Sequence, residues 1–186
     1  MEIVLLRHGK PSYTFKGKAR ASDISREIEL YDKANLADHP TPEALDIALR
    51  CDSVVCSALS RSLETANALG FEKINSTNAH FNEAALPHFK RGDIVMPIVA
   101  WVAVLRIFSL SGFSRHGESY LQCKQRATQA TKDLITTAQN HQRTLLVGHG
   151  IFNHFIAKEL RKQNWLGPKS PGKSHWSFAV YTKIDV

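Results

Sequence analysis

The segment Ile3-Val4-Leu5-Leu6-Arg7-His8-Gly9 gives the strongest fold signal in the sequence. Four branched apolar residues end abruptly at two basic residues and a glycine, which is typical of a strand buried on both faces of a parallel sheet. Residues 144–150, Thr-Leu-Leu-Val-Gly-His-Gly, repeat this pattern late in the chain. We therefore expect both segments to be inner strands of one sheet, each followed by a histidine.

Further strand and helix patterns alternate along the chain. Strands are expected over 53–56, around 73–76 and over 176–182. Helices are expected over 25–35, 44–50, 60–69, 120–138 and after Gly150, and residues 10–23 are expected to form a loop. Thr41-Pro42-Glu43 is a typical helix start, and Ser60 is a good N-cap. This alternation predicts an α/β fold around a mostly parallel sheet.

Composition places the chain among ordinary soluble globular proteins. It has 186 residues, of which 43% are apolar and 22% charged, and a chain of that length can bury one sizeable core. This composition argues against a disordered, repetitive or collagen-like architecture. We expect a single domain over residues 1–186.

The chain is basic, with a formal net charge of +7 and a pI near 9.5. An excess of positive charge favours an anionic partner, which could be a phosphorylated metabolite, a nucleic acid or an acidic membrane. The basic residues are scattered and form no continuous stripe, so an ordinary solvated surface is an equal alternative.

The cysteine content and the first residues of the sequence indicate a cytoplasmic location for this protein. Cys51, Cys56 and Cys123 form no CxxC motif and no zinc spacing, so we expect buried, reduced thiols. The first residues, 1–4, have neither the basic start nor the apolar length of a signal peptide.

The segment 84–118 is apolar at its centre and basic at its edges, where Lys90, Arg91 and Arg115 lie. Its uncharged part, 94–105, is too short to span a bilayer, so a buried or interfacial helix is expected. We interpret the segment as a helical, lid-like insertion, with a packing helix as the alternative. Trp101, Phe108 and Phe113 are expected in the core, although peripheral membrane attachment through 94–113 is a further hypothesis.

Polar clusters follow four of the predicted strands. They are Arg7-His8-Gly9, Ser57 to Arg61, Asn82-Glu83 and Gly148-His149-Gly150. The carboxyl ends of parallel strands lie at one edge of a sheet, where ligands bind. We therefore expect two histidines, two arginines and one carboxylate to meet in a single site.

These residue types suit phosphoryl transfer. A guanidinium group matches phosphate oxygens in a bidentate way, and a neutral imidazole can attack phosphorus and hold the phosphoryl group covalently. A second, protonated imidazole can neutralise charge in the transition state, and a carboxylic acid can give a proton to the leaving oxygen. Glycines beside both histidines, Gly9 and Gly150 among them, would let the backbone approach phosphate.

The same residues carry a family resemblance. Leu6-Arg7-His8-Gly9 resembles the signature of the histidine phosphatase, or phosphoglycerate mutase-like, superfamily, and residues 57–66 resemble its second motif. Gly117-Glu118-Ser119 is similar to a segment that often opens the long helix of this family, and Val147-Gly148-His149-Gly150 resembles the motif of its second histidine. The motifs stand in family order and span almost the whole chain.

The resemblance implies a short, phosphatase-type member with a three-layer α/β/α fold. By motif, His8 would be the nucleophile, while Arg7, Arg61 and His149 would form the phosphate pocket. Glu83 matches the proton donor by position, without the glycine-rich continuation that is common after it. The resemblance implies no metal and no other cofactor.

Contacts beyond this core are less determined by sequence. Ser57 is either a minor phosphate contact or a turn residue. Lys10 stands where an acidic or polar residue is common, and Phe15 lies near the position of a phosphate-binding asparagine. His116 imitates the first motif but does not follow a strand, so we do not expect it in the site. The remaining histidines show no metal-ligand spacing with one another; they are His80, His88, His141, His154 and His175.

The sequence therefore predicts a cytoplasmic phosphomonoester hydrolase that acts through a phosphohistidine on a small phosphorylated metabolite. A phosphohistidine phosphoprotein phosphatase and a phosphoglycerate mutase-type phosphotransferase are the enzymatic alternatives. A phospho-ligand binding module without catalysis is the non-enzymatic one. We expect no nucleic acid partner and no stable membrane insertion, and a homodimer is left open.

Overall fold

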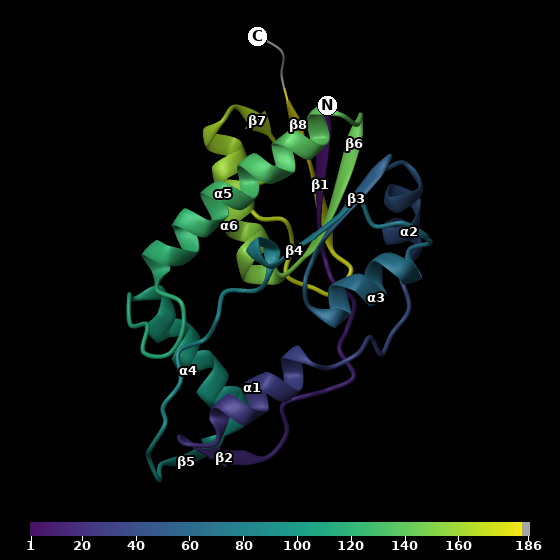
Figure 1. Ribbon diagram of the computed structural model, residues 1–186. Helices are drawn as coiled ribbons and strands as arrows, with labels where there is room; N and C mark the ends of the chain where they lie inside the picture. Colours follow the sequence, from purple (N-terminus) through teal and green to yellow (C-terminus); the bar gives the residue numbers. More distant parts are fainter. Residues whose placement is uncertain (184–186) are drawn as a thin grey trace.

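A six-stranded sheet forms the centre of the computed structural model, which describes residues 1–183 (Figure 1). Its order is β4-β3-β6-β1-β8-β7. The first four strands of that order are mutually parallel, β8 runs antiparallel to β1, and β7 runs antiparallel to β8. The bounds are β1 (Glu2–Arg7), β3 (Ser53–Ser57), β4 (Ser76–Asn78), β6 (Arg143–Gly148), β7 (Trp165–Leu166) and β8 (Phe178–Lys183).

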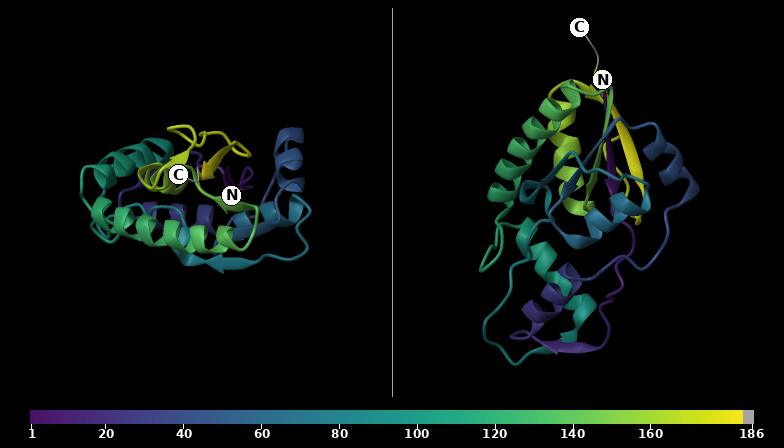
Figure 2. Two further views of the ribbon diagram at one scale, coloured as in Figure 1. Left: turned by 90° about the horizontal axis from the view of Figure 1, so that it is seen from above. Right: turned by 45° about the vertical axis from the view of Figure 1, so that its right-hand side comes forward.

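Helices cover both faces of this sheet, as the right-hand view of Figure 2 shows. On β1, Ile3 and Leu5 point into the core shared with α5 (Tyr120–Gln139) and α6 (Gly150–Lys162). Val4 and Leu6 point into the core shared with α2 (Pro42–Leu49) and α3 (Ser60–Ala68). All four side chains are fully buried. The alternation of strand side chains thus produces the predicted α/β architecture with a mostly parallel sheet between helical layers.

Most helix starts follow the sequence signals, with one exception. The Thr41 hydroxyl accepts from the Ala44 N–H at 3.2 Å and caps α2. The prediction that Ser60 caps α3 is wrong: Leu59 occupies the N-cap, and Ser60 is the first helical residue. The reason is that the Leu59 carbonyl already accepts the first bond of the helix, from the Ser62 N–H at 2.9 Å.

A smaller group of elements lies at the end of the molecule away from β7 and the N-terminus (Figure 1). It contains β2 (Lys18–Arg20), α1 (Ile24–Asp32), β5 (Val95–Pro97) and α4 (Ile98–Leu110). These elements share a third core with five buried residues, Ala21, Ile24, Ile98, Trp101 and Leu105. The prediction of an uninterrupted loop over 10–23 is wrong, because β2 forms by pairing with the remote β5.

Other boundaries moved by a few residues. α1 ends at Asp32 rather than at residue 35, and β4 covers 76–78 rather than 73–76 before a short 3-10 turn, η1 (Ala79–Phe81). Trp101 is buried as expected, but Phe108 and Phe113 are exposed, which corrects their core assignment. Within residues 1–183, no helix is long and apolar enough to cross a membrane. The last three residues of the predicted domain, 184–186, lie outside the described residues.

The three cysteines are free thiols. Cys56 and Cys123 are buried, whereas Cys51 is only partly covered. Burial raises the pKa of each thiol to about 12. All three therefore stay protonated at neutral pH, as unreactive core residues do.

Candidate active site

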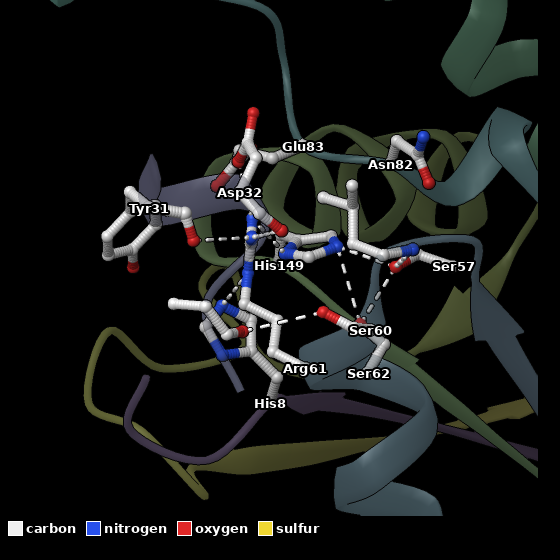
Figure 3. Close-up of polar contacts among 12 residues, drawn as sticks. His8, Tyr31, Asp32, Ser57, Ser60, Arg61, Ser62, Asn82, Glu83 and His149 are labelled. Carbon is white, nitrogen blue, oxygen red and sulfur yellow. Dashed lines mark hydrogen bonds and ion pairs between the residues drawn. The ribbon is translucent and has the colours of Figure 1, made fainter. Parts of the chain in front are cut away.

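The carboxyl ends of the parallel strands bring the predicted site residues together (Figure 3). His8 follows β1 and His149 follows β6, and their ring centroids lie 4.9 Å apart. Arg61, from the first turn of α3, places Nε 3.3 Å from His8 Nε2 and Nη2 3.5 Å from His149 Nδ1. Side chains from both ends of the chain thus converge, as the sheet-edge argument requires.

His8 is held as a neutral imidazole with one nitrogen available. Its Nδ1 lies 2.7 Å from the Gly9 carbonyl oxygen, which fits an Nδ1–H that donates to that oxygen. Nε2 then carries the lone pair and accepts from Arg61 Nε. Burial, followed by the nearby Arg61 charge, holds the pKa of His8 well below its usual 6.5. This is the protonation state that a nitrogen nucleophile needs.

His149 is fully buried and oriented by two serines. Ser57 Oγ donates to Ser62 Oγ at 2.8 Å, so His149 Nε2–H is the donor in its 2.7 Å contact with Ser57 Oγ. Nδ1 therefore faces Arg61 and the site. Burial, with His8 as the next cause, holds the pKa of His149 well below 6.5. A bound phosphate dianion would favour protonation of the ring, since an opposite charge stabilises the charged form.

Arg61 is buried and held by the carboxyl end of α1. Its Nη1 donates to the carbonyl oxygens of Tyr31 and Asp32 at 3.3 and 3.2 Å, and Nη2 donates to Asp32 Oδ1 at 3.1 Å. An arginine at a helix N-terminus opposes that helix's dipole, but the negative end of α1 offsets this. Asp32 was not predicted in the site, because it ends an ordinary helix and belongs to no motif.

Arg7 presents a donor without a protein acceptor. Its Nη1 donates to the Lys173 carbonyl, while Nε is buried and has no partner within residues 1–183. A Cβ built on Gly150 would lie 3.5 Å from that Nε, so the arginine passes the start of α6. Buried donors are normally satisfied, so this N–H is suited to an acceptor oxygen of a ligand.

Glu83 reaches the same place from the loop after η1. Its carboxylate oxygens accept from the N–H groups of Ala84, Phe152 and Ile151, at 2.9, 3.0 and 3.2 Å. The last two belong to the first turn of α6, whose N-cap His149 supplies no side-chain cap. Glu83 thus caps the N-terminus of α6 in place of an N-cap side chain. To act as a proton donor, its carboxyl group would have to turn one oxygen away from these amides.

A cavity of about 590 Å³ opens above these groups. Arg7, His8, Arg61 and Glu83 form its polar side. Apolar and aromatic residues form much of the rest, and Phe15 and Tyr31 stack with ring centroids 4.9 Å apart. Further lining residues are Ile28, Asp32, Ala84, Leu86, Val102, Arg106, Gly150, Ile151, His154, Ser170, Gly172 and Lys173.

A family model for the histidine phosphatase superfamily (branch 1) matches residues 3–177. The chain belongs to this superfamily. Comparison with curated proteins gave no match.

Solved structures of related fold support the assignment of the architecture. A mycobacterial glucosyl-3-phosphoglycerate phosphatase is 18% identical with a TM-score of 0.62, over 96% of this chain and 88% of that one. A mutant phosphoserine phosphatase from Entamoeba histolytica, in complex with phosphoserine, is 19% identical with a TM-score of 0.55, over 87% of this chain and 80% of that one. YhfR of Bacillus stearothermophilus is 17% identical with a TM-score of 0.62, over 96% and 89%.

Within this histidine phosphatase, the additional contacts predicted at Gly9 and Ser57 have other partners. The Gly9 N–H donates to Thr65 Oγ1 at 3.0 Å, and a Cβ at Gly9 would lie 2.3 Å from the Trp176 ring. Glycine is therefore needed there for packing. Ser57 is fully buried beside His149. Neither Gly9 nor Ser57 borders the cavity. Gly150 does border it, and the substrate contacts of Gly9, Ser57 and Gly150 all stay predictions.

Two histidines near the site carried no usable signal in the sequence. His175 Nδ1 lies 3.1 Å from the His8 carbonyl oxygen, and the two rings are 5.3 Å apart. Burial, followed by the Arg7 charge, lowers the pKa of His175. His154 lines the cavity from α6. His116, in contrast, stacks obliquely on His88 at 5.4 Å and does not border the cavity.

Proposed function

We propose that this histidine phosphatase is a phosphomonoester hydrolase that acts through a phosphohistidine on a small phosphorylated metabolite. The observation that supports this most directly is the neutral His8 imidazole, with Nε2 free of a proton and flanked by Arg61 and His149 at a cavity. A nucleophile beside cationic and protonatable groups is what a transferring phosphoryl group requires.

In the first step of the proposed reaction, the lone pair of His8 Nε2 forms a bond to phosphorus. The bond between phosphorus and the ester oxygen breaks, and that oxygen leaves with the bonding pair. Glu83 gives its proton to the leaving oxygen, so an alcohol departs. Arg7 and Arg61 hold the equatorial oxygens, and protonated His149 donates to one of them.

In the second step, water attacks the phosphorus of the phosphohistidine. The phosphorus–nitrogen bond breaks and its electron pair returns to Nε2 of His8. The Glu83 carboxylate takes the proton that the water loses, which restores the acid for the next turnover. Inorganic phosphate is then the second product, and no step requires a metal.

The cavity walls suggest a leaving group that offers both apolar surface and a negatively charged group. Phe15, Tyr31, Leu86 and Val102 line it, next to the cations Arg106 and Lys173. The names of two structural neighbours refer to phosphatases of glucosyl-3-phosphoglycerate and phosphoserine, which are small phosphorylated compounds. We further propose that the segment 84–118 is the lid of this cavity, because it supplies Leu86, Val102 and Arg106 to its wall.

We also propose a cytoplasmic location. The fold leaves all three cysteines as free thiols, and this supports a protein of a reducing compartment.

The proposal is tested by hydrolysis of p-nitrophenyl phosphate and of a panel of phosphorylated metabolites. Wild-type protein should turn over at least one of them, and His8→Ala should lose about 1000-fold or more in kcat/KM because it lacks the nucleophile. His116→Ala, an exposed histidine outside the cavity, is the matched control and should behave as wild type.

A second measurement concerns the intermediate. Acid-labile phosphate should be trapped on wild-type protein after rapid quenching with a ³²P-labelled substrate, and should be absent from His8→Ala. Equal turnover by wild type and His8→Ala would remove the proposal. Tight binding of a phosphorylated compound without turnover would favour the binding module.

A further inference from the structure

The outward face of α4 is apolar and has no protein partner within residues 1–183. Val99 and Ile107 are 62% and 63% exposed, and Leu110 lies on the same side of the helix at 48%. The opposite side carries the buried Trp101 and Leu105. An ordinary surface helix presents polar residues outward, so this face departs from the usual pattern.

Cations lie in the two-stranded ribbon that directly precedes α4. In the β2–β5 ribbon, Arg20 pairs with Val95 and Lys18 with Pro97, and directly opposed residues share one face of a ribbon. All four of these residues are exposed, while the alternate positions pack into the third core. Two acidic residues lie beside these cations: Asp93, whose carboxylate is 4.0 Å from the Arg20 guanidinium, and the exposed Asp23, whose N–H donates to the Arg20 carbonyl at 3.0 Å.

Cations also lie near the other end of the helix. Exposed aromatic rings gather there on the side of Trp101: Phe108 and Phe113 have ring centroids 5.7 Å apart, and Phe89 lies 6.1 Å from Phe113. Lys90 follows Phe89 directly and is exposed, and so is Arg115. The His88 N–H donates to the Arg115 carbonyl at 3.1 Å, which holds these two loops together.

The charges decide between the two kinds of partner that an apolar helix face can take. Residues 85–117 contain Lys90, Arg91, Arg106 and Arg115 against a single acid, Asp93. A twofold contact between two copies of this face would bring the same cations against each other. An anionic bilayer surface offers hydrocarbon to the apolar residues and negative headgroups to the cations around them.

We propose that the outward face of α4, with the cations near both ends of this helix, docks this protein on an anionic lipid surface. At 13 residues the helix is about 20 Å long, so it would lie in the plane of the interface. Val102 and Arg106, on the neighbouring side of the same helix, line the cavity. Docking would therefore hold the cavity close to the headgroups. The inference does not depend on the proposed hydrolysis and can fail separately.

The test is co-sedimentation of the full chain with vesicles. Vesicles of phosphatidylcholine mixed with phosphatidylglycerol should pellet the protein, and phosphatidylcholine alone should pellet much less. High salt should weaken the pelleting, because it screens the cations. Lys90→Gln/Arg115→Gln should bind the mixed vesicles more weakly, by about fivefold for each charge removed.

The apolar face is tested by Val99→Asp/Ile107→Asp, which should lose about tenfold or more in vesicle affinity. Leu49→Asp is the matched control, since Leu49 is 83% exposed at the end of α2, far from α4 in Figure 1. It should bind as wild type does. Far-UV circular dichroism of each variant checks that the fold is retained.

Three results would overturn the proposal. The first is no pelleting of wild type with the mixed vesicles. The second is equal pelleting of wild type and Val99→Asp/Ile107→Asp, both with native circular dichroism. The third is a wild-type dimer in light scattering that Val99→Asp/Ile107→Asp makes monomeric and that vesicles do not dissociate, which would assign the face to a second copy of this chain.

Discussion

At the scale of single residues, Arg61 donates hydrogen bonds to the protein and is also expected to bind the phosphate group. Asp32 holds Arg61 Nη2 at 3.1 Å, while two backbone carbonyls hold Nη1. We expect Asp32→Asn to strengthen inhibition by inorganic phosphate about fivefold, because the substitution removes a partly exposed competing charge. The inhibition constant measures this, and an unchanged or weaker inhibition would contradict it.

The two buried imidazoles predict how stability depends on pH. The pKa of both His8 and His149 is lowered well below 6.5 in the folded protein, so only the unfolded chain binds protons at these rings just below pH 6.5. The free energy of unfolding should fall with decreasing pH, by about 1.4 kcal/mol per pH unit for each histidine. Urea unfolding of wild type and His149→Gln measures this; the variant should show the shallower slope, and a flat wild-type profile would disprove it.

Some of these residues could be predicted from sequence and others could not. Arg7, His8, Arg61 and His149 were predictable because each lies beside a recognisable strand end or helix start, and topology then brings them together. Asp32 acts through a contact between elements that no local pattern connects. His175 likewise approaches His8 only after β8 has paired with β1.

At the scale of elements, Glu83 links the proposed chemistry to the stability of α6. Glu83→Ala removes the acceptor of two helix N–H groups, and we expect it to lower the free energy of unfolding by about 1–2 kcal/mol. Glu83→Gln keeps a carbonyl oxygen and should cost less. Both variants should lose kcat/KM, since neither can donate a carboxylic proton.

Urea denaturation and kinetics of the two variants separate these roles. Wild-type kcat/KM in Glu83→Gln would exclude Glu83 as the proton donor. Full stability of Glu83→Ala would show that α6 does not need this carboxylate.

The long elements were predictable, because their apolar periodicity and their caps are local. The short strands β2, β5 and β7 were not, since each exists only through pairing with a partner elsewhere in the chain. The Ser60 cap failed for a related reason: the turn after β3 places Leu59 first. Gly9 was predicted to let the backbone approach phosphate; the structure adds a packing reason for glycine there, the Trp176 ring, which sequence spacing cannot reveal.

At the scale of the whole molecule, the cavity lies between a large core and a small one. The core under α5 and α6 contains nineteen buried residues, whereas the core shared by α1 and α4 contains five. We expect amides of α4 and α1 to exchange with deuterium faster than those of β1 and β6, because fewer apolar contacts oppose local opening. Hydrogen exchange with mass spectrometry measures this, and equal protection would contradict it.

The position of β1 has a consequence for the newly made chain. The strand that leads to His8 is translated long before both of its neighbours, β6 and β8. Until they are made, its backbone N–H and C=O groups have no partner strand and its apolar side chains are uncovered, which is a condition that favours aggregation. Residues 143–148 and 178–183 must therefore be synthesised before the first histidine can acquire its native surroundings.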